Sequence, residues 1–80
     1  MKLHEALKLK NDYEFSQVHF DDTVPNHYFE KKINGMVLII ENEEDNHNEW
    51  FGSIVNHNIK FYTYESFKSL IDAVKLGTWL

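Results

Sequence analysis

The sequence predicts a single α+β domain over residues 1–80. The expected architecture is an antiparallel sheet of four to five strands, built from two hairpins, with a C-terminal helix packed on one face and a short N-terminal helix. Three observations predict this fold. Asn34-Gly35 separates two strand-like runs, Asn56-His57-Asn58 separates two more, and residues 64–74 have the apolar spacing of an amphipathic helix.

The N-terminal segment predicts one helix and one strand. Helically spaced side chains mark one face of residues 2–10: Leu3, Ala6, Leu7 and Lys10. Asn11-Asp12 is expected to end this helix, because both residue types favour caps and turns. Residues 14–20 are rich in β-forming side chains and precede Asp21-Asp22, so we expect a strand there.

Asn34-Gly35 predicts the tip of a two-residue hairpin, because both positions of a type I′ turn need a positive φ. The expected register pairs residues of the runs 27–33 and 36–42 in this way: Ile33 with Met36, Lys31 with Leu38, and Phe29 with Ile40. Val37 and Ile39 then lie on the opposite face from Leu38. A strand that is apolar on both faces is usually covered on both. We therefore expect either the N-terminal helix or a second subunit on the face opposite the C-terminal helix.

The second hairpin joins residues 49–55 to residues 59–63, and its register stays open between two alternatives. A three-residue loop places Phe51 and Val55 on the face of Ile59 and Phe61. A two-residue loop places Trp50 and Ile54 there instead.

The C-terminal helix has a continuous apolar stripe, formed by Tyr64, Phe67, Leu70, Ile71 and Val74. Thr63 is its expected N-cap, and Gly77 suits the left-handed conformation that often follows a helix. Trp79 and Leu80 are expected to fold back onto the core.

Composition and charge exclude several classes of function. The chain has no Cys and no Arg, and eight Lys against thirteen Asp and Glu give a formal charge of −5. This acidity, together with the missing guanidinium groups, argues against direct nucleic-acid binding. The longest apolar run is far too short to span a bilayer, and the N-terminus does not have the pattern of a signal peptide. We expect a cytoplasmic protein. Residue types with AT-rich codons are abundant, which suggests a low-GC bacterium or one of its phages.

The acidic segment after residue 40 is the candidate site that the sequence favours. It comprises Glu41, Glu43, Glu44, Asp45 and Glu49, followed by Trp50. A calcium loop requires Gly at its sixth position, where counting from Asp45 gives Trp50, so the pattern does not fit that motif. Two interpretations remain: a solvated loop that keeps the protein soluble, or a patch that binds a basic protein partner.

The five histidines do not form a recognisable catalytic or metal motif. They are His4, His19, His27, His47 and His57. His19 has Asp21 and Asp22 nearby in sequence, but neither a nucleophile nor a Gly-rich turn accompanies the group. We therefore expect no catalytic residue, no metal and no cofactor, and the chain is predicted not to be an enzyme.

Residues 50–76 resemble a module of small phage and mobile-element proteins of unknown function. The shared features are a Trp-bearing strand, a short strand that ends in an aromatic-x-Thr pattern, and an Ile-Asp-Ala helix: Trp50-Phe51-Gly52-Ser53-Ile54, Phe61-Tyr62-Thr63 and Tyr64 to Ala73. The resemblance implies a phage or mobile-element origin and assigns no functional residue.

These observations favour a non-catalytic protein-interaction module. One form of it is a phage or mobile-element factor that binds and masks a host protein, including as an acidic mimic of nucleic acid. The alternative is a small homodimeric housekeeping or regulatory domain of a low-GC bacterium. The two-sided apolar strand around Val37 and Ile39 favours a homodimer.

Overall fold

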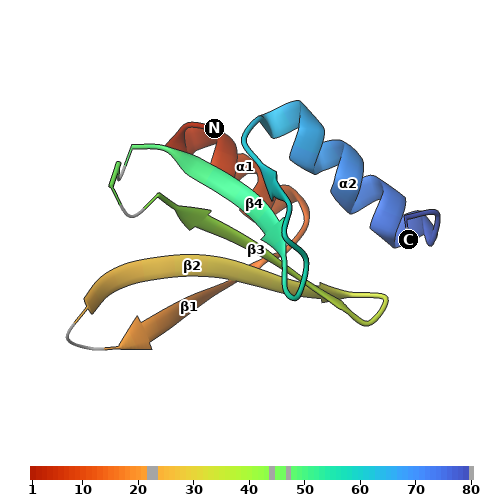
Figure 1. Ribbon diagram of the computed structural model, residues 1–80, viewed down its shortest axis with the longest axis horizontal. Coiled ribbons are helices and arrows are strands. Elements are labelled where there is room, and N and C mark those ends of the chain that lie inside the picture. The colour runs from red at the N-terminus through yellow and green to blue at the C-terminus, as the bar shows by residue number, and fades with distance from the viewer. Residues whose placement is uncertain (22–23, 44, 47, 80) are drawn as a thin grey trace.

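The fold is a five-stranded antiparallel sheet with two helices (Figure 1). The computed structural model describes residues 1–21, 24–43, 45–46 and 48–79, and describes only the backbone of residues 19–21 and 24–27. Its elements follow in this order: α1 (Leu3–Asp12), β1 (Ser16–Asp21), β2 (Val24–Ile33), β3 (Met36–Asn42), β4 (Trp50–Ile54), β5 (Lys60–Phe61) and α2 (Tyr64–Leu76). The strands lie in the sheet in their order along the chain, so every connection between neighbouring strands is a simple reversal.

The β2–β3 hairpin has the predicted turn and the predicted register. Asn34 and Gly35 have φ of 49° and 80°, as a type I′ turn requires. Ile33 pairs with Met36, and the register continues without a shift to the pair Tyr28 and Glu41. The side-chain amide of Asn34 also donates to the Val74 carbonyl at 2.7 Å, which connects the turn to the end of α2.

The β4–β5 hairpin has the facing predicted by the two-residue alternative, but its connection is longer and covers residues 55–59. Gly52 pairs with Phe61 and Ser53 with Lys60, so Phe61 shares a face with Trp50 and Ile54. Asn56 provides the left-handed residue of the turn, with φ of 72°. The strands are shorter than predicted, since β4 covers residues 50–54 and β5 only residues 60–61.

The N-terminal residue continues the hydrogen bonding along β4 beyond the short β5. The Met1 carbonyl accepts from the Trp50 amide at 2.8 Å. The Met1 amino group donates to the carbonyls of Trp50 and Tyr62, at 2.7 and 2.5 Å. Met1 itself is 6% exposed.

Helix α2 buries the predicted stripe. Phe67, Leu70, Ile71 and Val74 are between 0 and 4% exposed. The Thr63 hydroxyl accepts from the Ser66 amide at 3.2 Å, and Gly77 ends the helix with φ of 73°. Trp79 packs against the core as predicted, and Leu80 lies outside the described residues.

Helix α1 differs from the prediction in its length and in its buried face. It extends through Asn11 to Asp12, whose carboxylate pairs with Lys8 at 2.9 Å, one turn earlier. The helix buries Ala6 and Leu9 at 0%, whereas Leu3 and Leu7 are 48% and 38% exposed.

The strand that follows α1 begins two residues later than predicted. Glu14 has φ of 59°, a left-handed conformation that reverses the chain and is incompatible with a strand. Phe15, directly after it, is 3% exposed, and β1 starts at Ser16.

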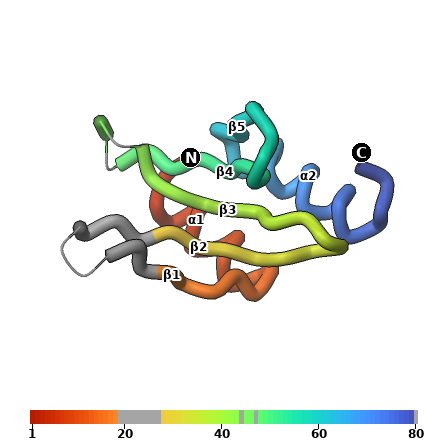
Figure 2. Tube along the Cα trace, turned by 60° about the horizontal axis from the view of Figure 1, so that its bottom comes forward, coloured from red at the N-terminus to blue at the C-terminus, as the bar shows by residue number. Residues whose placement is uncertain are grey.

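Both helices pack on the same face of the sheet, so the expectation that α1 covers the opposite face is wrong. Side chains of α1 and α2 belong to one core cluster with Leu38 and Ile40 of β3. Figure 2 shows both helices behind the sheet. The Tyr13 hydroxyl, just after α1, donates to Asp72 of α2 at 2.6 Å and holds the two helices together.

Candidate binding face of the sheet

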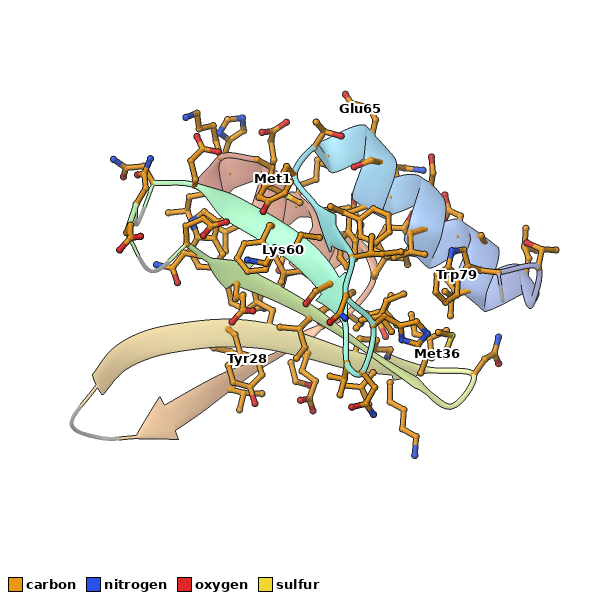
Figure 3. The ribbon with its side chains drawn as sticks, in the orientation of Figure 1. Met1, Tyr28, Met36, Lys60, Glu65 and Trp79 are labelled. Carbon is orange, nitrogen blue, oxygen red and sulfur yellow. The ribbon has the colours of Figure 1, made fainter. Side chains whose placement is uncertain are left out.

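The side of the sheet opposite the helices, here called the open face, is the candidate functional site. Strand pairing determines which described side chains point to it, because paired residues share a face. Its apolar members are Val18, Tyr28, Val37, Ile39 and Phe51, and its charged members are Glu30, Lys32, Glu41 and Lys60. Two of them, Tyr28 and Lys60, are labelled in Figure 3.

The register arranges the open face in two rows that run across the strands. The first row contains Val18, Tyr28, Glu41 and Phe51. The second row contains Ser16, Glu30, Ile39, Ser53 and Lys60. Val37 and Ile39 are half-buried by their neighbours in the sheet, although no helix covers them. The structure therefore confirms that β3 is apolar on both faces and leaves one face without a second layer.

Phe51 is the centre of an aromatic cluster on the open face. Its side chain is 5% exposed but lies outside the core cluster beneath the helices. The Lys60 ammonium lies 4.7 Å from the centre of the Phe51 ring, and the Tyr62 ring lies 5.9 Å from it at 41°. The cation and the second ring cover Phe51, which fixes the position of Lys60 at the β5 edge.

Glu41 lies beside this cluster and is half-buried. Burial raises the pKa of its carboxyl above the ordinary value, because desolvation penalises the charged form. Lys60 acts in the opposite direction on this pKa, and Glu43 adds to the rise. A partly desolvated carboxylate next to Lys60 makes this corner of the face polar within an otherwise apolar row.

A shallow hollow of about 590 Å³ lies at the β4–β5 end of the open face. It is lined by Glu41, Phe51, Ser53, Ile54, His57, Asn58, Ile59, Lys60 and Tyr62. The His57 ring is held against Trp79, with ring centres 5.3 Å apart, and its Nδ1 lies 3.3 Å from the Val55 carbonyl. The hollow thus combines a carboxylate, an ammonium group and aromatic rings, a set suited to binding polar and aromatic groups of a partner.

The structure separates the residues of the predicted acidic patch. Trp50 is 8% exposed and stacks on Phe29 in the core, with ring centres 5.6 Å apart. Glu49 forms ion pairs with Lys2 and, at 3.6 Å, with the N-terminal amino group. The hydrogen bond from Lys2 is the main cause that lowers the pKa of Glu49.

The other predicted acidic residues lie in different surroundings. Glu41 is on the open face, Glu43 is half-buried beside it, and Asp45 is exposed in the loop. Glu44 lies outside the described residues. Because the charge of Glu49 is paired with Lys2 and the N-terminal amino group, and Trp50 is in the core, the structure does not bring the six predicted residues together as one surface.

The histidines are also dispersed. His4 is exposed on α1 and His57 is exposed in the β4–β5 connection. The backbones of His19 and His27 pair between β1 and β2, and His47 lies outside the described residues. Among the described residues, no three His, Asp or Glu side chains gather as metal ligands would. No helix in the described part of the chain is long and apolar enough to span a bilayer.

A comparison of the chain with protein-family models, curated proteins and solved structures finds no match. The resemblance of residues 50–76 to phage and mobile-element proteins therefore stays a prediction. We therefore infer the function from the geometry of the open-face residues.

Sequence reasoning identified part of this face and missed the rest. The alternation around Val37 and Ile39 predicted an apolar outer surface on β3. It did not identify Phe51 and Lys60 as its neighbours, because the register of the second hairpin was open. Without that register, the sequence does not indicate that the Lys60 side chain lies beside Phe51.

Proposed function

We propose that this chain is a non-catalytic protein-interaction domain that binds a protein partner through the open face of its sheet. One observation carries the proposal: both helices cover the same side of the sheet, and Val37, Ile39 and the Phe51 cluster remain on the other side. A strand that is apolar on both faces is usually covered on both, and a protein partner would supply the second layer on this side.

The shape and chemistry of the face support a macromolecular partner rather than a small ligand. Small-molecule sites are enclosed pockets that bury most of their ligand. Here the hollow beside Lys60 is shallow and lies at the edge of a broad surface of β-strand side chains. A surface with aromatic and aliphatic side chains at its centre and charges around them has the composition of a protein interface.

The predicted role of masking a host protein is one instance of such binding. Masking would require that the partner is a host protein. Like the phage or mobile-element origin of the chain, this is a proposal. The sequence predicted that the partner contacts the acidic segment, and we propose instead that it contacts the open face. Glu41 belongs to both sets of residues.

Site-specific photo-crosslinking tests the proposed function. The variant Tyr28→p-benzoylphenylalanine places a photoreactive group on the open face, and the matched control carries it at Glu65, on the exposed face of α2 (Figure 3). We expect crosslinked protein adducts from position 28 and few from position 65 in cells that produce the full chain. Equal yields from the two positions, or no adduct from position 28, would refute the proposed function.

A further inference from the structure

We propose that the partner on the open face is a second copy of this chain, packed sheet on sheet about a two-fold axis that runs along the strands between β3 and β4. The inference rests on the proposed function, since it names the occupant of the same face. Two observations carry it: the charges of the face are self-complementary in this arrangement, and the area is large enough for a weak dimer.

The charges are arranged in the row that contains Glu30, Ile39, Ser53 and Lys60. A two-fold axis along the strands keeps this row in register and exchanges β2 with β5. Glu30 of each copy then faces Lys60 of the partner subunit, and Ile39 faces Ser53 of the partner subunit. Within the described part of the chain, neither Glu30 nor Lys60 forms an ion pair with another side chain. The Lys60 ammonium lies 4.7 Å from the centre of the Phe51 ring, so it must turn from this ring to reach Glu30 of the partner subunit.

A two-fold axis that runs across the strands keeps β2 opposite β2 and β5 opposite β5. If it passes through this row, Glu30 faces Glu30 of the partner subunit and Lys60 faces Lys60 of the partner subunit, and like charges across an interface weaken binding. If it lies midway between this row and the row of Lys32 and Val37, Glu30 faces Lys32 of the partner subunit and Lys60 has no charged counterpart. The axis along the strands is the arrangement that pairs Glu30 with Lys60, and the charge reversals below distinguish it from the others.

The selected axis also matches the uncharged side chains. It places Tyr28 against the partner's Tyr62, because Tyr62 follows β5 beside Phe51. It places Val37 against the partner's Val55, which is 42% exposed and whose amide bonds to the Val37 carbonyl of its own chain at 2.9 Å. In the row of Tyr28 the same axis places Glu41 against the partner's Phe51, over which the partner's Lys60 lies, so aromatic, aliphatic and charged groups surround the central pair of Ile39 and Ser53.

The size of the face is compatible with a weak dimer. The axis places β2 to β5 against β5 to β2 of the partner subunit and leaves β1 outside, so four strands spaced about 4.8 Å apart, over about 20 Å of their length, give roughly 400 Å² on each copy. Two copies would remove roughly 800 Å² from water, the size of a weak, transient interface. We therefore expect association in the micromolar range rather than an obligate dimer.

The first test is the mass of the full chain in solution as a function of concentration. Sedimentation equilibrium from about 1 to 500 µM should show the mass rise from the monomer value of 9.6 kDa toward twice that value. A mass that stays at the monomer value over this range overturns the second-copy proposal.

The second test uses charge reversal at the proposed contact. Glu30→Lys and Lys60→Glu should each weaken self-association, by about 10- to 100-fold in Kd, because each change replaces two attractive contacts with two repulsive ones. The double variant Glu30→Lys/Lys60→Glu should recover the wild-type Kd, and so should an equimolar mixture of the two single variants. Circular dichroism of each variant checks that the changes, at half-buried Glu30 and exposed Lys60, leave the fold intact.

The outcomes separate this proposal from the proposed function. If the chain stays monomeric but position 28 crosslinks to another protein, the second-copy proposal is wrong and the interaction face stands. If position 28 gives no adduct and the chain stays monomeric, both fail. If the chain dimerises but Glu30→Lys has the wild-type Kd, the proposed axis is wrong.

Discussion

Gly52→Ala is the sharpest test of the packing between the sheet and α2. Gly52 lies in the middle of β4, between Ile40 of β3 and Phe61 of β5. A Cβ atom at this position would lie 2.3 Å from Cγ and Cδ1 of the Phe67 ring. Nonbonded carbon atoms are most stable at about 3.5–4.0 Å, so the ring would have to move by roughly 1 Å or more. The strand thus requires glycine here because α2 lies directly on it.

The expected effect is large because Phe67 cannot move freely. Its side chain is 0% exposed, and the Phe61 ring lies against it at 5.7 Å. Overpacking a close-packed core destabilises it by about 1–3 kcal/mol, and we expect about 3 kcal/mol here. For a domain of this size, that loss corresponds to a fall in Tm of roughly 12–24 °C. Gly52 does not have a positive φ, so the effect is steric and not conformational.

Urea unfolding at low micromolar concentration, followed by far-UV circular dichroism, measures this loss of stability. Ser53→Ala is the matched control, because it changes the next residue on the open face and should alter the free energy of unfolding by no more than about 0.5 kcal/mol. In the double variant Gly52→Ala/Phe67→Leu the smaller side chain makes room for the methyl group. Its destabilisation should be at least about 1 kcal/mol smaller than the sum of the single changes. A Gly52→Ala variant that melts within about 2 °C of the wild type would refute the reasoning.

Three further predictions concern α2, the β2–β3 turn and Glu41. Leu70→Ala should lower the free energy of unfolding by about 2–5 kcal/mol, because Leu70 is 4% exposed in the core. An unchanged urea midpoint would show that Leu70 does not lie on the buried face of α2. Asn34→Gly keeps the left-handed turn but removes the amide that donates to the end of α2, so it should lower stability by about 1 kcal/mol, whereas no loss would mean that water replaces this bond. Glu41→Gln should raise Tm at pH 7, because burial raises the pKa of Glu41 in the folded state. The contribution of Glu41 to the stability of the wild type is then fully present below the ordinary pKa of 4.5 and is lost as the pH rises through the folded value, so the difference between the two proteins should vanish near pH 4. A variant that is less stable than the wild type at pH 7 would show that the Lys60 attraction outweighs desolvation.

Local chemistry determined several elements of the fold from the sequence alone. A type I′ turn needs two residues that tolerate positive φ, so Asn34-Gly35 determined the hairpin and, with it, the register of β2 on β3. The apolar spacing of α2 determined its buried face, and Thr63 and Gly77 determined its ends. In each case the decisive residues are close together in the chain, so the sequence pattern contains the information.

Other features depend on contacts between distant segments. The buried face of α1 is decided by where its neighbours lie: Ala6 and Leu9 enter the core, while Leu3 and Leu7 do not. The apolar spacing within α1 is compatible with burial of either Leu3 and Leu7 or Ala6 and Leu9. Trp50 looked like part of a surface patch beside acidic residues, but its stacking on Phe29 exists only once β2 and β4 lie on either side of β3.

The open face combines both kinds of information. The alternation of β3 determined that Val37 and Ile39 lie opposite Leu38 and Ile40, because side chains on a strand alternate between its faces. Only the tertiary structure decided which face the helices cover, since both α1 and α2 could be attached to either side by the same connections. The Tyr13–Asp72 hydrogen bond and the shared core hold them on one side. The other side of the sheet is therefore left for a partner.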